Sequence, residues 1–262
     1  MQQAATTPHQ RRLIAAVDET ERNIDGDDWY LMCATTVDPN NRTTFTMLRD
    51  LQKIGQRQPT RDRLNRHAIH ANNLARTESG RLDLFEAEAI IAADPSLRLD
   101  VTIRRIAVRE TFEDARQICV AHLVTHLDAD VGSVTFDTRD YLETKTRKPK
   151  PGVDVATHRQ LVNHHDLATI DQLKTTGRVK ADLDIVWAND VGNPHLWIPD
   201  IVAYACGQAL AYGNPQRLVR LASRLHISEA ATRPDSVDPA PSTGIADKLE
   251  TLRRQASPKT EQ

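Results

Sequence analysis

The feature that most constrains the fold is a short apolar run that ends in an aspartate. Residues 13–17 read Leu-Ile-Ala-Ala-Val, and Asp18 follows them directly. An apolar run of this length is typical of a central strand that is covered on both faces. In open α/β sheets, a carboxylate at the end of such a strand lies at the edge where binding sites form. The run therefore predicts an α/β protein with Asp18 close to its functional site.

Two further aspartates occupy comparable positions in distant parts of the chain. Asp137 ends the short strand expected at residues 132–137, and Asp200 falls in the first turn of a helix expected over residues 198–212. Taken singly, Asp137 could be a turn residue, and Asp200 could interact favourably with the helix dipole. Taken together, converging carboxylates repel one another, and oxygen ligands of this kind suit Mg²⁺ or Mn²⁺. The hypothesis is a divalent-cation site, provided that the three side chains meet.

Two other acidic residues lie next to these positions. Glu19 follows Asp18, so in a continuing strand its side chain would point to the opposite face. Glu19 could therefore join the catalytic group only if the strand has ended. Asp190 follows the last expected strand and reads as a turn residue, with a place in the site as the alternative.

The overall charge excludes a protein coated with positive charge, but it allows a local basic strip. The chain has 262 residues, a formal net charge of −2, 39% hydrophobic residues and 27% charged residues, as is ordinary for a globular protein. Four cations gather in the loop expected over residues 138–155: Lys145, Arg147, Lys148 and Lys150. Beside an acidic metal site these cations would attract a nucleic acid. A solvated surface loop is the alternative interpretation.

Cysteine usage and hydropathy together predict a cytoplasmic protein. Cys33, Cys119 and Cys206 are far apart and lie in apolar contexts, which is typical of buried reduced thiols. The polar start of the sequence is not followed by the apolar segment of a secretory signal. No apolar run approaches the roughly 20 residues that a membrane span requires.

The alternation of periodic segments predicts one α/β domain over residues 11–213. Strands are expected near residues 13–18, 29–37, 98–108, 132–137 and 183–187, with helices between most of them. Residues 233–244 are rich in proline and serine, as in a linker. We therefore expect residues 214–262 to be a largely flexible, disordered C-terminal tail. A short amphipathic helix near residues 245–252 could form there and contact a protein partner.

Three segments resemble motifs of a known family. Residues 16–20 (Ala-Val-Asp-Glu-Thr) are similar to an opening Asp-Glu-Ser strand motif, and residues 69–71 (Ile-His-Ala) resemble an internal histidine segment. Asp190, followed by residues 196–204, resembles a closing motif, typically Leu-Gln-x-Ala-Asp-x-Val-Ala-Tyr. These are motifs of the domain of unknown function 3800 family, in the ribonuclease-H-like (retroviral-integrase-like) superfamily. The resemblance covers roughly residues 11–213.

The resemblance implies a fold and an activity. The fold would be a ribonuclease-H-like mixed sheet of about five strands flanked by helices, with the first and fourth strands as central neighbours. The superfamily's acidic site carries over to Asp18, Asp137 and Asp200, which implies an Mg²⁺- or Mn²⁺-dependent nuclease that hydrolyses phosphodiester bonds. The sequence departs from the family pattern at Thr20, Trp197 and Pro199, and it shows no evident fourth acidic ligand. The alternative is a non-catalytic binding module for nucleic acid or a protein partner.

Overall fold

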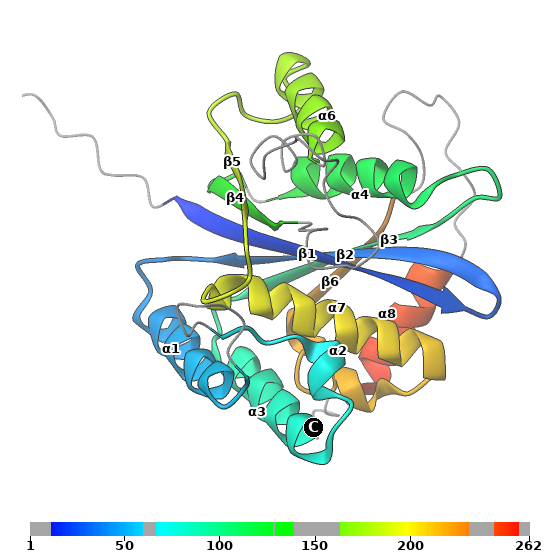
Figure 1. Ribbon diagram of the computed structural model, residues 1–262. Helices are drawn as coiled ribbons and strands as arrows, with labels where there is room; N and C mark the ends of the chain where they lie inside the picture. The colour runs from blue at the N-terminus through cyan, green and yellow to red at the C-terminus, as the bar shows by residue number, and fades with distance from the viewer. Residues whose placement is uncertain (1–11, 60–66, 128, 139–162, 231–243, 257–262) are drawn as a thin grey trace, which may run out of the picture.

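The computed structural model describes residues 12–59, 67–127, 129–138, 163–230 and 244–256, which form a mixed sheet with helices on both faces (Figure 1). The sheet has six strands in the order β5-β4-β1-β2-β3-β6. The strands are β1 (Leu13–Ile24), β2 (Asp27–Val37), β3 (Arg98–Arg105), β4 (Val131–Asp137), β5 (Asp184–Ala188) and β6 (Leu225–Glu229).

The strand directions identify the topology. β1, β2 and β3 are antiparallel neighbours, whereas β4 runs parallel to β1 and β5 runs parallel to β4. The first and fourth strands are therefore adjacent near the centre of the sheet, which confirms the ribonuclease-H-like arrangement expected from the resemblance. A sixth strand, β6, lies parallel to β3 and extends the sheet beyond the five strands expected.

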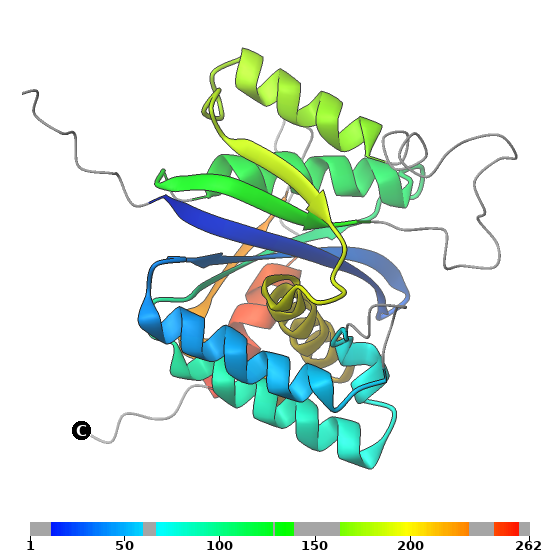
Figure 2. The ribbon, with the colours of Figure 1, turned by 60° about the vertical axis from the view of Figure 1, so that its left-hand side comes forward.

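Two layers of helices enclose the sheet (Figure 2). One layer holds α4 (Phe112–His126) and α6 (His164–Thr175). The other layer holds α1 (Arg42–Gln56), α2 (Ala71–Leu74), α3 (Glu78–Ala93), α7 (Pro194–Tyr212) and α8 (Ile245–Ala256). Figures 1 and 2 both place α7 directly against β1 and β2, and contacts between these elements agree.

Alternation along the strands divides the interior into two cores. Val17 of β1 and Phe136 of β4 are fully buried in the core under α4 and α6. Cys33 of β2 and Val101 of β3 point the other way and are buried in the core with α1, α3, α7 and α8. Because neighbouring residues of a strand face opposite sides, a polar residue that follows Val17 faces α7.

Helix ends follow the local chemistry that the sequence offers. The side chain of Thr111 accepts a hydrogen bond from the Asp114 backbone N–H while the Asp114 side chain accepts one from the Thr111 backbone N–H, a capping box that starts α4. Gly213, with a φ of 61°, ends α7 in the left-handed conformation that glycine tolerates. In contrast, α7 begins at Pro194, earlier than the residue 198 predicted, so Pro199 lies inside the helix.

Segments beyond residue 213 take part in the core, which departs from the domain end expected there. β6 pairs with β3, and Ile245, Leu249 and Leu252 of α8 are buried in the core on the α7 side. The short strand β6 offers only two apolar residues, so its sequence gave little sign of a sheet. Because the apolar face of α8 is buried, this helix does not present it to a protein partner.

Two other properties concern the described residues. Cys33, Cys119 and Cys206 are all buried and unpaired, as expected. Among the helices that the structure describes, none combines the length and hydropathy needed to cross a membrane.

Candidate functional site

The central pair of strands places Asp18 beside Asp137. The parallel register aligns Val17 with Phe136, so the two aspartates follow on adjacent strands, which in a sheet lie about 4.8 Å apart. Val17 and Phe136 are buried under α4, so the aspartates face α7. β4 ends at Asp137, whereas β1 continues to Ile24 because β2 pairs with it along this length. The site therefore lies at the end of β4 and midway along β1, not at the end of β1.

α7 brings Asp200 to the same face of the sheet. Because the helix begins at Pro194, Asp200 lies in its second turn rather than its first. The helix dipole acts mainly within the first turn, so it does not account for this aspartate. Instead, Asp200 Oδ2 accepts a hydrogen bond of 2.8 Å from the backbone N–H of Ala71, the first residue of α2. Asp200 thereby ties α2 to α7 as well as facing the other carboxylates.

Asp190 is a fourth carboxylate of the site, which the sequence suggested only as an alternative to a turn. It follows β5, and its Oδ2 lies 3.1 Å from Nε2 of His70. Its backbone oxygen accepts a 2.8 Å hydrogen bond from the indole nitrogen of Trp197. Trp197 is buried against Gly55, where an added Cβ would lie 2.6 Å from the indole ring. Trp197 thus anchors the loop that carries Asp190.

The carboxylates raise one another's pKa. Burial, followed by repulsion from Asp200, Glu19 and Asp137, raises the pKa of Asp18 well above its ordinary value. Burial and repulsion from Asp190, Glu19 and Asp200 raise the pKa of Asp137 to about 8. Burial raises the pKa of Asp200 to about 6, although its hydrogen bond from Ala71 and the nearby His70 act in the opposite direction. The cluster therefore carries more acidic groups than nearby cations can neutralise, and a bound cation would relieve this repulsion.

Their present spacing is wider than that of a formed metal site. Within the described ranges, no group of three or more His, Cys, Asp or Glu side chains lies close enough to hold a metal ion. The structure thus brings Asp18, Asp137 and Asp200 into electrostatic contact without placing them as a set of metal ligands. All of them offer the hard oxygen atoms that Mg²⁺ and Mn²⁺ prefer.

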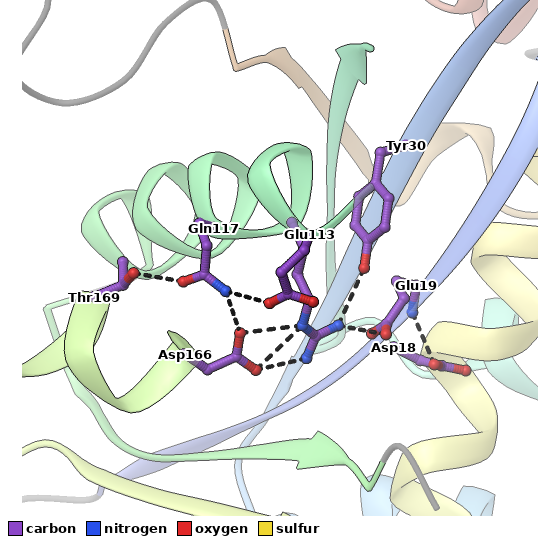
Figure 3. A network of polar contacts seen from close by, with 8 residues as sticks. Asp18, Glu19, Tyr30, Glu113, Gln117, Asp166 and Thr169 are labelled. Atoms are coloured by element: carbon purple, nitrogen blue, oxygen red, sulfur yellow. Dashed lines mark hydrogen bonds and ion pairs between the residues drawn. The ribbon is translucent and has the colours of Figure 1, made fainter. Parts of the chain in front are cut away.

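Glu19 points to the opposite side of β1 from Asp18 (Figure 3). It forms an ion pair with Arg116, whose side chain is 1% exposed. The backbone N–H of Glu19 donates a 2.7 Å hydrogen bond to Asp18 Oδ1, so the two residues are linked through the main chain. β1 has not ended at this point, which is the condition under which Glu19 was expected to stay out of the site.

Arg116 is the centre of a buried polar network behind β1. Figure 3 labels other members of this network: Glu19, Tyr30, Gln117 and Asp166. Its guanidinium forms an ion pair with Asp166 of α6 at 2.8 Å and donates a 3.1 Å hydrogen bond to the hydroxyl of Tyr30 on β2. Gln117 also donates to Asp166, at 2.9 Å. A buried charge requires such partners, because an unpaired one is strongly destabilising. The network therefore fixes α4 and α6 to the strands that carry the site.

The four cations expected to guide a substrate lie outside the described residues. Lys145, Arg147, Lys148 and Lys150 fall between Thr138, the last residue described after β4, and Asn163 before α6. Their contribution to a nucleic-acid interface stays a prediction.

Comparisons with known proteins give a limited result. No protein-family model matches the sequence, and no curated protein matches it either. The structure is similar to the crystal structure of the ribonuclease H2 from Pyrococcus horikoshii OT3, with a TM-score of 0.42 and 12% identity, over 93% of this chain and 99% of that chain. A similarity of this extent assigns no activity or residue role to this chain. Membership of the domain of unknown function 3800 family stays a prediction.

Proposed function

We propose that this chain is a metal-dependent nuclease that hydrolyses phosphodiester bonds at the cluster of Asp18, Asp137, Asp190 and Asp200. The observation that carries the proposal is the electrostatic coupling of carboxylates from separate segments on one face of the sheet: Asp18, Asp137 and Asp200 act on one another, and Asp190 acts on Asp137 and Asp200. Burial, together with repulsion among these carboxylates, raises the pKa of Asp18, Asp137 and Asp200, a pattern that is common at functional sites. A ribonuclease-H-like sheet supports them.

The oxygen donors fit Mg²⁺ or Mn²⁺. Asp18 and Asp137 would hold the ion, and Asp200 would complete the site, as the resemblance implies. When bound, such a cation would supply Lewis-acid activation of a phosphoryl group and of water. Because the carboxylates now repel one another, we expect them to draw together when positive charge enters the cluster.

Other side chains of the site hold and orient these groups. His70 pairs with Asp190, and its imidazole is 33% exposed, so it borders the cluster from the solvent side. Arg22 lies against Gly207 of α7, where an added Cβ would meet its Nε at 2.9 Å. From this position the positive charge of Arg22 offsets part of the rise in the pKa of Asp200. Gly207 therefore leaves room for the guanidinium of Arg22, which favours the ionised form of Asp200 without a direct ion pair.

A second candidate function is a binding module that keeps the fold and lacks catalysis. The specific observation in its favour is that the described residues contain no ready set of three metal ligands. Asp200 also has a structural role, because it accepts a hydrogen bond from the backbone N–H of Ala71, the first residue of α2. On this interpretation the cluster would bind no cation, and the fold would only recognise a nucleic acid or a protein.

A Mn²⁺ titration separates the two functions. For a nuclease, Mn²⁺ at about 100 times its dissociation constant should stabilise the protein by about 2.7 kcal/mol. Asp18→Asn should abolish both this stabilisation and Mn²⁺-dependent cleavage of labelled single- and double-stranded DNA and RNA. Asp184→Asn is the matched control, because Asp184 is exposed at the start of β5. Unchanged stability with Mn²⁺ in the unsubstituted protein would reject the nuclease and leave the binding module.

A further inference from the structure

A groove of about 610 Å³ lies on the same side of the sheet as α7 but beside its other end. It runs between α3 and the 3₁₀ turn η1 (Pro215–Leu218), and its lining includes Arg81, Leu82, Phe85, Glu88 and Arg217. Asp200 is near the start of α7 and the groove is just past its end, a separation of about 20 Å along the helix. The groove is therefore a separate feature from the acidic cluster.

A buried carboxyl group with an unused oxygen forms the floor of the groove. The Glu88 side chain is 4% exposed, and in the described structure its Oε1 has no hydrogen-bond partner. Oε1 forms an ion pair with Arg217 Nη1 at 3.7 Å, which is beyond hydrogen-bond distance, so its hydrogen-bonding capacity is unused. A buried polar atom without a partner is costly, so this oxygen favours a ligand that offers an N–H donor.

The wall of the groove is an exposed apolar surface that includes an aromatic ring. Phe85 is 53% exposed and Leu82 is 68% exposed. The guanidinium of Arg220 lies over the Phe85 ring, 3.8 Å from its centroid. Exposed aromatic rings and guanidinium planes are the surfaces on which proteins stack unpaired nucleobases.

The charges around the groove oppose a simple cationic ligand for Glu88. Arg81, Arg217 and Arg220 outnumber the carboxyl groups of Glu78 and Glu88, so an amine would be repelled and an anion attracted. The ligand must therefore combine an anionic group, a flat ring and N–H donors on the edge of that ring. A nucleotide has all three features, and guanine is the base that offers two adjacent N–H donors to a carboxylate.

We propose that this groove binds a guanine nucleotide within a single-stranded nucleic acid. The base edge would donate to Glu88, the ring would lie along Phe85 and Leu82, and the phosphates would face Arg81 and Arg217. The assignment rests on the proposed function in one respect, because that function makes nucleic acid the ligand class. It adds a position for the substrate strand at a distance from the acidic cluster.

Fluorescence anisotropy with the full chain tests the assignment. The protein carries Asp18→Asn and is kept in EDTA at a pH of about 8, so that no probe is cleaved and the Glu88 carboxyl group, whose pKa is raised to about 7, is ionised. The probes are two fluorescein-labelled single-stranded DNAs, one with guanines and one with inosine in their place, which removes the exocyclic amine. We expect the guanine probe to bind about tenfold more tightly. In Glu88→Gln this preference should fall to about twofold or less, because the amide accepts only one of the two hydrogen bonds.

A pair of phenylalanine variants tests the wall of the groove. Phe85→Ala should weaken binding of both probes about tenfold through loss of stacking. Phe45→Ala is the control, since Phe45 is 65% exposed on α1 and outside the groove. Equal affinity for the two probes, or an equal loss in Phe45→Ala, would overturn the proposal. Thermal melting of each variant checks that the fold is retained.

The failure of this inference can be told apart from the failure of the proposed function. If Asp18-dependent cleavage occurs and the guanine preference is absent, only the groove assignment fails. If the preference depends on Glu88 and cleavage is absent, the groove stands and the nuclease proposal fails.

Discussion

Replacing Glu88 by glutamine should stabilise the protein at alkaline pH and have little effect at acidic pH. Burial raises the pKa of Glu88 to about 7 from an ordinary value of 4.5, although Arg217 and Arg220 oppose the rise. Between these two values the folded protein retains a proton that the unfolded chain has lost. The free energy of unfolding therefore falls as pH rises through this interval, and it falls no further above it. Glutamine does not titrate, so the variant should lack this loss.

The structure sets the size of the effect. A shift of 2.5 pKa units, taken from 4.5 to about 7, corresponds to about 3 kcal/mol at 1.36 kcal/mol per unit. Little discount for solvent screening is needed, since the side chain is only 4% exposed. With a urea m-value of about 3 kcal/mol per M, the variant's unfolding midpoint at pH 8 should exceed that of the unsubstituted protein by about 1 M. Below pH 4 the two midpoints should converge.

Urea unfolding followed by circular dichroism, at pH values from 4 to about 8, measures this difference. Glu86→Gln is the matched control on the same helix, because Glu86 is 51% exposed and forms a surface ion pair with Arg57. Its effect should stay below about 1 kcal/mol at every pH. A midpoint difference for Glu88→Gln that does not change with pH would refute the reasoning. It would mean that Glu88 remains ionised in the folded protein.

Substitutions at three further residues test other parts of the structure. Arg116→Met should cost about 3–5 kcal/mol of unfolding free energy, because it leaves two carboxylates without their buried partner; a loss below about 1 kcal/mol, measured by urea titration, would contradict this. Leu249→Ala should cost about 2–5 kcal/mol, since Leu249 of α8 is fully buried, and an unchanged melting temperature would show that α8 is dispensable. Asp200→Asn keeps an acceptor for the Ala71 N–H, so calorimetry should show lost Mn²⁺ binding at near-normal stability, whereas Asp200→Ala should lose both. Mn²⁺ binding by Asp200→Asn equal to that of the unsubstituted protein would exclude Asp200 from the cation site.

The sequence could predict those parts of the fold that depend on local pattern. The apolar run before Asp18 indicated a strand covered on both faces, and β1 is such a strand at the centre of the sheet. The capping residues Thr111 and Asp114 marked the start of α4, and Gly213 marked the end of α7. These signals are local because a cap or a buried strand is determined by residues near it in sequence.

The local sequence pattern could not predict features that depend on long-range packing. β6 is short and weakly apolar, and it joins the sheet only because β3 offers an open edge. The start of α7 at Pro194 was missed because Pro199 resembles a helix start, whereas here it lies within the second turn. Asp190 resembled a turn residue until the pairing of β4 with β5 placed it beside the other carboxylates. For the same reason, its partner His70 had only a motif resemblance to suggest a place near the site.

The two acidic residues of β1 show how one strand can serve the site and its support. Asp18 faces α7 and the cluster, whereas Glu19 faces α4 and is held by Arg116. The N–H of Glu19 donates to Asp18 Oδ1, so the ion pair behind the sheet fixes the peptide on which the site carboxylate depends. A cation that drew Asp18 toward Asp137 would have to stretch that hydrogen bond, or bind Asp18 with the hydrogen bond intact. The Arg116 network therefore limits how closely the carboxylates of the cluster can approach one another. Removing the Arg116 side chain should change the affinity for Mn²⁺, even though Arg116 lies on the opposite face of β1 from the cluster.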